Sequence, residues 1–381
     1  MPILMCKNEP VYNETTNTVL NEALLPKFPK GEFDYNSFKR NRYFSEGTNG
    51  GARALHQQLL DLSKKEMPSL TVDMKLRFCL SDCYWFKYEG VDATWESRSP
   101  YINDFSRLDY ITRDSSAPTI ETGGSFNKRW VKDERGNRFL IKTLENDQIR
   151  AEIFSSRLAE AFSLNVQKAF PIGKQGLDGS LVALGNITDT EWMLLPYSIV
   201  SDPQKHRVNG KRPSEIVSVY DDPQQFLHQA LEMVLFDAIV MNQDRANNMG
   251  NLAIFKHSET GEVKFPPLFD FNLAKISPGN YGLHQFLVEV VDNLRKDNLV
   301  EDSLEILRRW NMVVPDQIEK YKNEEVQERP QSTLEIEGGP ELSLEQGIPY
   351  HKVLDGFWSR RLELLIEMLE DDPFNDTLAF S

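Results

Sequence analysis

The sequence predicts an α+β protein with two lobes, a β-rich first lobe and a mainly helical second lobe. Residues 128–144 predict a β-hairpin, because runs of alternating apolar and polar residues flank the turn "DERGN" at residues 133–137. Two more strand-like runs follow at 171–184 and 191–200. Beyond residue 223 most of the apolar residues recur at helical spacing. The first lobe is therefore expected to be a sheet with one helix, and the second a group of helices.

Further elements are expected in a definite order along the chain. Residues 150–162 predict an amphipathic helix, residues 223–242 an apolar helix, and residues 252–272 a second hairpin with its turn at "SETGE". Two long helical patterns follow at 281–310 and 353–372. A chain of 381 residues is long enough for two domains or one two-lobed unit.

We divide the chain into three parts on these patterns. Residues 1–115 form an N-terminal extension that is expected to pack on the first lobe, residues 116–197 form the first lobe, and residues 198–381 form the helical lobe. Within the last part, the charged segment near 323–345 contains Pro and Gly and is expected to be a mobile loop.

Composition narrows the possible partners. The formal net charge is -15, with 58 acidic against 43 basic residues, which argues against broad contact with nucleic acid or an anionic membrane. No apolar run is long enough for a membrane span, and the N-terminus lacks a secretion signal, so we expect a cytoplasmic protein. Cys79 and Cys83 lack the second half of a zinc site, and reduced, buried or idle thiols are the preferred interpretation.

A glycine-containing segment precedes the first hairpin. Two adjacent glycines let a backbone approach a phosphate closely and point N–H groups at it. An ordinary turn is the alternative, since Gly is common in turns. The segment consists of Gly123, Gly124, Ser125, Phe126, Asn127 and Lys128.

Lys142 ends the hairpin, and Glu152 lies near the start of the following helix. A strand lysine can bind the α- and β-phosphates of ATP if a carboxylate holds it in place. The alternatives are a solvated lysine on an edge strand and an acid that favours the helix dipole.

Two acidic residues lie beside the second hairpin. Asp244 follows the apolar helix in "NQDRANNMGN" and is a candidate base for a substrate hydroxyl, with a nearby Asn as metal ligand. Asp270 lies between Phe269 and Phe271, where burial without a cation would be costly, so it is a second candidate metal ligand. Capping of a helix or a turn is the alternative for both.

The order of these residues is the strongest signal, because a kinase-type phosphoryl transferase uses the same order. With these motifs the chain resembles the HipA-like serine/threonine kinases over roughly residues 120–310. Through "LSDCYWFK" at 80–87 it is most similar to Gram-positive and phage-borne members. The resemblance implies a protein-kinase-like fold shared with phosphoinositide kinases. It also implies ATP- and Mg²⁺-dependent phosphorylation of a protein Ser or Thr.

The resemblance also implies individual roles. Asp244 matches the catalytic aspartate, Lys142 and Glu152 the phosphate-binding lysine and its partner, and Asp270 a metal ligand. Residues 123–128 match the loop over the phosphates, and Ser125 a position at which some members phosphorylate themselves. Some members have DNA-binding antitoxin partners. The adenine-facing hinge is matched by Met193, Leu194, Leu195 and Pro196.

Two positions depart from the family pattern. The usual His two residues after the catalytic aspartate is Ala246 here, and Met249 stands where the metal-binding Asn is usual. Asn251 is the best match by flanking sequence, with Asn248 and Asn247 as alternatives. An ATP-binding pseudokinase or regulatory module, a lipid kinase and an interaction protein therefore stay open beside the preferred interpretation, a protein kinase.

Overall fold

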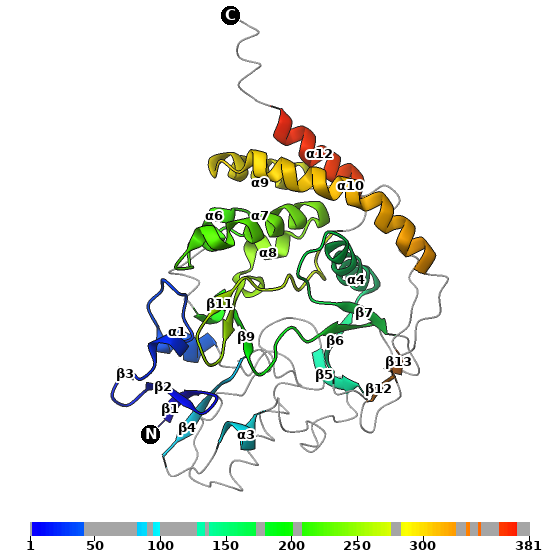
Figure 1. Ribbon diagram of the computed structural model, residues 1–381. Coiled ribbons are helices and arrows are strands. Elements are labelled where there is room, and N and C mark those ends of the chain that lie inside the picture. The colour runs from blue at the N-terminus through cyan, green and yellow to red at the C-terminus, as the bar shows by residue number, and fades with distance from the viewer. Residues whose placement is uncertain are drawn as a thin grey trace, which may run out of the picture.

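The computed structural model describes residues 2–41, 82–89, 94–99, 128–133, 137–172, 180–200, 208–275, 283–324, 333–335, 342–343 and 358–371. These residues form three antiparallel sheets and a group of helices, arranged as Figure 1 shows. Buried apolar side chains from the extension, the first lobe and the helical lobe belong to one continuous cluster. The predicted α+β class is confirmed.

The first lobe is built on a six-stranded sheet with the strand order β13-β12-β5-β6-β8-β7. The predicted hairpin is confirmed, because β5 and β6 pair with Trp130 opposite Leu140. β6 lies between β5 and β8, and most of its residues are buried, so both faces of this strand are covered. The strands are β5 (Lys128–Asp133), β6 (Arg138–Leu144), β7 (Ala169–Ile172), β8 (Ser180–Gly185), β12 (Thr333–Glu335) and β13 (Leu342–Ser343).

β12 and β13 lie within the segment that was expected to be a mobile loop. β12 pairs with β5 through Leu334 opposite Asp133, and β13 pairs with β12. An edge strand such as β5 exposes backbone N–H and C=O groups, which even a short segment can satisfy. The described part of this segment is therefore attached to the first lobe.

The helix of the first lobe, α4 (Asn146–Ala161), packs against β7 and β8. Its first turn is fixed by a capping box in which the backbone N–H of Glu145 donates to Gln148 Oε1 at 3.1 Å. The apolar residues that predicted one face of this helix, from Ile153 to Phe162, are buried. The same helix carries Glu152 into the interior.

A three-stranded sheet with the order β11-β10-β9 lies in the middle of the molecule (Figure 1). It consists of β9 (Trp192–Pro196), β10 (Ala253–His257) and β11 (Val263–Lys264). β10 and β11 confirm the second predicted hairpin. The short helix α5 (Tyr197–Val200) follows β9 directly.

The helical lobe is organised around α7 (Pro223–Val240). Asp222 accepts a hydrogen bond from the backbone N–H of Gln224, and Pro223 occupies the first turn, so the helix begins as predicted. The helix ends at Met241, which takes a left-handed conformation with φ 55°. In Figure 1, α9, α10 and α12 lie as a layer beyond α6 and α7. The other elements are α6 (Pro213–Val217), α8 (Gln243–Asn247), η4 (Met249–Asn251), α9 (Leu283–Lys296), α10 (Val300–Glu324) and α12 (Trp358–Glu370).

The helical pattern at 281–310 forms two helices rather than one continuous helix. α9 ends at Lys296, and α10 begins at Val300. Asn298 between them has φ 56°, a left-handed conformation that Asn tolerates better than most residues. None of the described helices has the length and apolar composition that crossing a membrane requires.

The N-terminal extension forms a four-stranded sheet with the order β3-β2-β1-β4. It packs on the middle sheet, where Lys256 Nζ donates to the carbonyl of Leu25 at 2.7 Å and the N–H of Cys83 donates to Met193 Sδ at 3.2 Å. Met193 belongs to residues 116–197, which were assigned to the first lobe, and Lys256 belongs to the range assigned to the helical lobe. The elements are β1 (Pro2–Cys6), β2 (Glu9–Asn13), β3 (Thr18–Val19), η1 (Glu22–Leu24), α1 (Tyr35–Asn41), β4 (Tyr84–Tyr88) and α3 (Trp95–Arg98).

Candidate active site

Lys142 lies between two carboxylates at the junction of the lobes. Its Nζ is 2.6 Å from Glu152 Oε1 on α4 and 2.6 Å from Asp270 Oδ1, which follows the middle sheet. Lys142 and Glu152 are 3% and 2% exposed, and Asp270 is 26% exposed. The structure thus brings together three predicted residues that come from three different elements.

The charge of this lysine is held by its surroundings. Burial alone would lower the pKa of Lys142, but the nearby carboxylates of Asp270 and Glu152 outweigh that effect and raise the pKa above its ordinary value. Lys142 therefore stays a cation under all ordinary conditions. A fixed cation of this kind is suited to an anionic ligand that enters from the exposed side of Asp270.

Glu152 also orients the segment that carries Asp270. Its Oε2 accepts the backbone N–H of Phe271 at 3.0 Å, while Phe271 itself is buried. Asp270 has φ 60°, a left-handed conformation that costs energy for a residue with a Cβ. The strain is held in place by the anchored Phe271 on one side and the ion pair to Lys142 on the other.

Asp244 and Asn251 face each other across the loop after α7. Asn251 Nδ2 donates to Asp244 Oδ2 at 2.6 Å, and the side chain of Asn251 is buried. Because the amide nitrogen is used in this bond, the amide oxygen is the atom that Asn251 can offer to a metal.

The two alternative asparagines are placed differently. Asn248 is exposed, and its Oδ1 accepts the backbone N–H of Gly250 at 2.9 Å, which caps η4. Asn247 is the last residue of α8, and its side chain lies outside the described part of the chain. Asn251 contacts the carboxylate of Asp244, whereas Asn248 contacts Asp244 through the backbone, its N–H donating to the Asp244 carbonyl at 2.8 Å.

The predicted hinge is the strand β9. Met193, Leu194 and Leu195 are buried, Pro196 is partly buried, and the backbone of all four pairs with β10. Among the residues predicted to cover the phosphates, Gly123 to Asn127 lie outside the described residues. Lys128 begins β5, directly opposite Lys142 in the register of the hairpin.

The sequence interpretation missed a second buried ionic group, formed by Asp237, Asn242 and Arg245. Arg245 Nε is 2.8 Å from Asp237 Oδ2, and Asn242 Nδ2 donates to Asp237 Oδ1 at 3.2 Å. Burial raises the pKa of Asp237 to about 6, although Arg245 and Asn242 act in the opposite direction. An acid within the otherwise apolar run of residues 233–241 was the available signal, since such a group needs a partner in the interior.

Arg245 also connects the two loops of the site. Its Nη1 donates to the carbonyl of Asn251 at 2.9 Å, and its Nη2 donates to the carbonyl of Phe269 at 2.7 Å. Asn251 and the segment that leads to Asp270 are therefore neighbours in space. Their side chains offer an amide oxygen and a carboxylate, which are the hard oxygen ligands that Mg²⁺ prefers.

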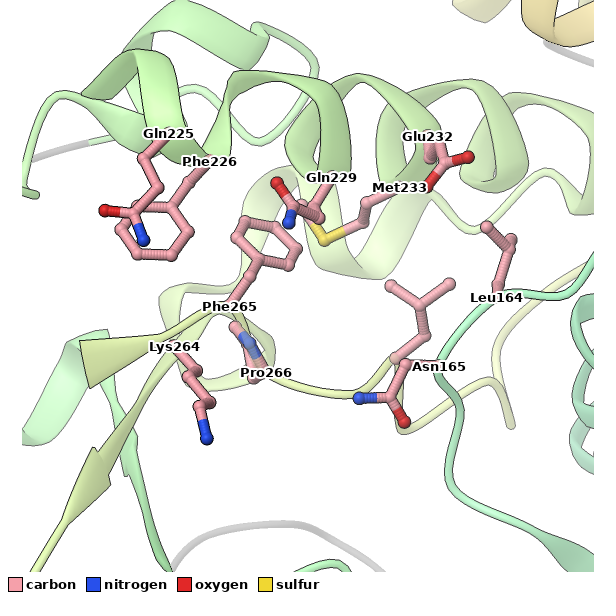
Figure 2. A pocket seen from close by; sticks show the side chains of 11 residues that line it. Leu164, Asn165, Gln225, Phe226, Gln229, Glu232, Met233, Lys264, Phe265 and Pro266 are labelled. Atoms are coloured by element: carbon pink, nitrogen blue, oxygen red, sulfur yellow. The ribbon is translucent and has the colours of Figure 1, made fainter. Parts of the chain in front are cut away.

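A separate cavity of about 330 Å³ lies between α7 and the segment after β11 (Figure 2). Figure 2 shows Met233 and Phe265 directed into it, with Gln225 and Lys264 toward one end. None of the predicted site residues lines this cavity. Its lining consists of Leu164, Asn165, Gln225, Phe226, Gln229, Glu232, Met233, Lys264, Phe265, Pro266 and Leu268.

Comparison with known proteins identifies the class of fold. No family model matches the chain, and no curated protein matches it in sequence. Among solved structures, it is similar to the Shewanella oneidensis MR-1 toxin HipA, solved with HipB and operator DNA. That similarity has a TM-score of 0.50 and 12% identity, and it covers 97% of each chain. A proinflammatory kinase of Helicobacter pylori, CtkA, is matched at a TM-score of 0.45 and 13% identity over 68% of this chain and 95% of that chain.

The chain therefore has a two-lobed, kinase-like fold of the HipA type. The expected fold class and the expected resemblance are both confirmed at the level of the fold. At 12% identity the similarity concerns the fold alone.

Proposed function

We propose that this chain is an ATP- and Mg²⁺-dependent serine/threonine protein kinase, which transfers the γ-phosphate of ATP to a protein hydroxyl. The observation that carries the proposal is the buried lysine held between two carboxylates, with Nζ 2.6 Å from both Glu152 and Asp270. A cation that is fixed at the junction of two lobes matches the requirement for binding the α- and β-phosphates. The HipA-type fold supports the same reading.

Lys142 would bind the phosphates, and Glu152 would hold it in position. Because Glu152 also accepts the N–H of Phe271, the lysine and Asp270 are fixed by one common carboxylate. The loop 123–128 would cover the phosphates and the hinge 193–196 would contact adenine, as the family resemblance implies. Ser125 is proposed as a site of autophosphorylation.

Asp270 and Asn251 would hold the metal. Among the described residues, no group of three His, Cys, Asp or Glu side chains could bind a metal ion alone. That is compatible with Mg²⁺, which is usually bound by one or two protein ligands together with phosphate and water. When bound, the ion would neutralise the charge that develops on the phosphates. Asp270 pairs with Lys142 in this structure, and its partly exposed carboxylate is the group that it would offer to the ion.

Asp244 would act on the substrate hydroxyl. Its Oδ2 is held by Asn251 Nδ2, so the carboxylate that receives or orients the hydroxyl proton is fixed to the same residue that binds the metal. The residue that orients the substrate hydroxyl and the residue that would hold the metal are therefore fixed to each other.

The proposed partners are ATP, a protein substrate and an antitoxin-like protein. The Shewanella HipA structure contains HipB and operator DNA, which motivates an antitoxin-like partner here. The net charge of -15 argues against direct binding of DNA or a membrane by this chain itself. A cytoplasmic location is part of the proposal.

The test is incubation of the purified protein with Mg²⁺ and ATP, followed by mass spectrometry of the intact chain and its peptides. We expect phosphorylation of the chain or of an added protein, and its loss in Asp244→Ala and Asp270→Asn. Asp221→Asn, at an exposed position, is the matched control. Full transfer by Asp270→Asn would contradict the proposal. An ATP-dependent rise in Tm without transfer would indicate a pseudokinase, and transfer to phosphoinositide vesicles alone would indicate a lipid kinase.

A further inference from the structure

One buried arginine joins the three segments on which the candidate site depends. Arg245 is 1% exposed and lies immediately after Asp244 in α8. Its Nε binds the Asp237 carboxylate on α7, its Nη1 binds the carbonyl of Asn251, and its Nη2 binds the carbonyl of Phe269. All three nitrogens of the guanidinium are thus used, each toward a different segment.

The geometry requires an arginine rather than any cation. A guanidinium presents its N–H donors in a rigid planar fork, so its three acceptors are held at fixed relative positions. An ammonium group has its donors on a single atom and could not reach all three acceptors together. The spacing between the backbone of Asn251 and that of Phe269 is therefore set by one rigid group.

The surroundings keep this group in one orientation. The guanidinium carbon lies 5.6 Å from the ring centroid of Phe269 and 5.2 Å from that of Phe271. Asn242 binds the second oxygen of Asp237, so the acid that anchors the arginine is itself anchored. A buried charge with an ionic partner and a hydrogen bond from each of its three nitrogens is costly to move, which makes the arrangement stiff.

We propose that Arg245 is a positioning residue that sets the separation between the two candidate metal ligands, Asn251 and Asp270. The proposal rests on the proposed kinase function of the same site. It assigns no contact between Arg245 and ATP, metal or substrate. Its effect is carried through two carbonyl groups, one belonging to Asn251 and one belonging to the residue before Asp270.

A positioning role makes a prediction that a purely structural role does not. Loss of the fork should change the Mg²⁺ dependence of the protein even when the folded state is as stable as before. A structural role alone would lower stability and leave the Mg²⁺ dependence of the remaining folded protein unchanged. Stability and Mg²⁺ dependence must therefore be separated by the choice of variants.

Three variants separate them. Arg245→Lys keeps a cation beside Asp237 but loses the fork. Arg245→Met leaves Asp237 buried without its cation and should lower Tm by several degrees. The double variant Arg245→Met/Asp237→Leu removes the buried pair entirely and should recover most of that Tm, because apolar residues can replace a buried ion pair. Arg309→Lys is the control. Arg309 is exposed on α10 and pairs with Glu232 of α7, the helix that also carries Asp237.

The measurements are Tm, the Mg²⁺ concentration for half-maximal phosphate transfer, and Mg²⁺-dependent ATP binding by calorimetry. In Arg245→Lys and in the double variant we expect the required Mg²⁺ concentration to rise about 10- to 100-fold, as for residues that support metal ligands. The control should match the wild type. A double variant that recovers both Tm and the wild-type Mg²⁺ dependence would overturn the proposal.

Failure of the proposed function would be recognised separately. A wild-type chain that transfers no phosphate contradicts the kinase function. The calorimetric Mg²⁺ dependence of ATP binding in the same four variants still decides the role of Arg245, because it needs no turnover. Unchanged Mg²⁺ dependence of binding in Arg245→Lys, or no Mg²⁺-dependent binding by the wild type, would contradict the positioning role.

Discussion

Two buried ionic clusters, one within the candidate site and one next to it, differ in their access to solvent. The Lys142 cluster contains one cation and two carboxylates, and one of these, Asp270, is 26% exposed. The second cluster, Asp237 with Arg245, is buried on all sides. The first cluster can therefore exchange a partner with a ligand from solvent, whereas the second can only hold its position. In this proposal the Lys142 cluster binds the ligand, and the Asp237–Arg245 pair holds the neighbouring backbone in place.

The electrostatic balance differs in the same way. With two carboxylates around one cation, the pKa of Lys142 lies above its ordinary value despite burial. In the second cluster, burial prevails over a single cation, and the pKa of Asp237 is raised to about 6. Two carboxylates face one cation around Lys142, and this excess of negative charge would favour a further cation at Asp270, as the proposed function requires.

Breaking the open cluster should have the largest effect. Lys142→Met removes the cation that separates Glu152 from Asp270, and we expect phosphate transfer to fall by at least about 100-fold. Two carboxylates without their cation should also lower the free energy of unfolding by about 3–5 kcal/mol. Steady-state kinetics and denaturant unfolding measure these effects, with the exposed Lys168→Met as control. Wild-type turnover by Lys142→Met would remove the central support for the kinase interpretation.

A smaller and more selective effect is expected within the loop that joins the clusters. Asn251→Ala should lower phosphate transfer and raise the Mg²⁺ requirement by about 10- to 100-fold, because it would remove the proposed metal ligand together with the bond to Asp244. Asn248→Ala should keep wild-type Mg²⁺ dependence and cost about 1 kcal/mol of stability through the lost cap. Magnesium titrations of both variants decide the assignment. Equal losses in the two would contradict the choice of Asn251.

Local patterns predicted the elements that local chemistry decides. The hairpin of β5 and β6 and the helix α7 follow from alternation, helical spacing and the caps at their ends. The break at Asn298 was not predictable in this way, because the apolar spacing continues across it while one residue adopts a left-handed conformation. The pairing of β12 with β5 was missed as well, since it depends on an open edge about 200 residues earlier in the chain.

The candidate site was predictable only in part for the same reason. Lys142 and Asp270 are 128 residues apart, and their order along the chain, not any local pattern, pointed to a common site. Arg245 and Asp237 are only eight residues apart, yet their contact depends on the break between α7 and α8, where Met241 is left-handed. Sequence spacing on a continuous helix does not describe that break. An acid in an apolar helix indicated that a partner exists, but not which residue it is.

The smallest effect on phosphate transfer is expected from the closed cluster of Asp237 and Arg245, whose pH dependence concerns stability alone. The pKa of Asp237 is about 6 in the folded protein against 3.8 as its ordinary value, so the folded state binds the proton more tightly than the unfolded state. The stabilisation by this proton is complete below about pH 4 and is lost as the pH rises through about 6. Denaturant unfolding at a series of pH values should show a steeper loss of stability between these limits for the wild type than for Asp237→Asn. Asp302→Asn, at an exposed position on α10, should behave like the wild type. A constant difference in unfolding free energy between wild type and Asp237→Asn across this range would mean that Asp237 remains ionised in the folded protein, with Arg245 prevailing over burial.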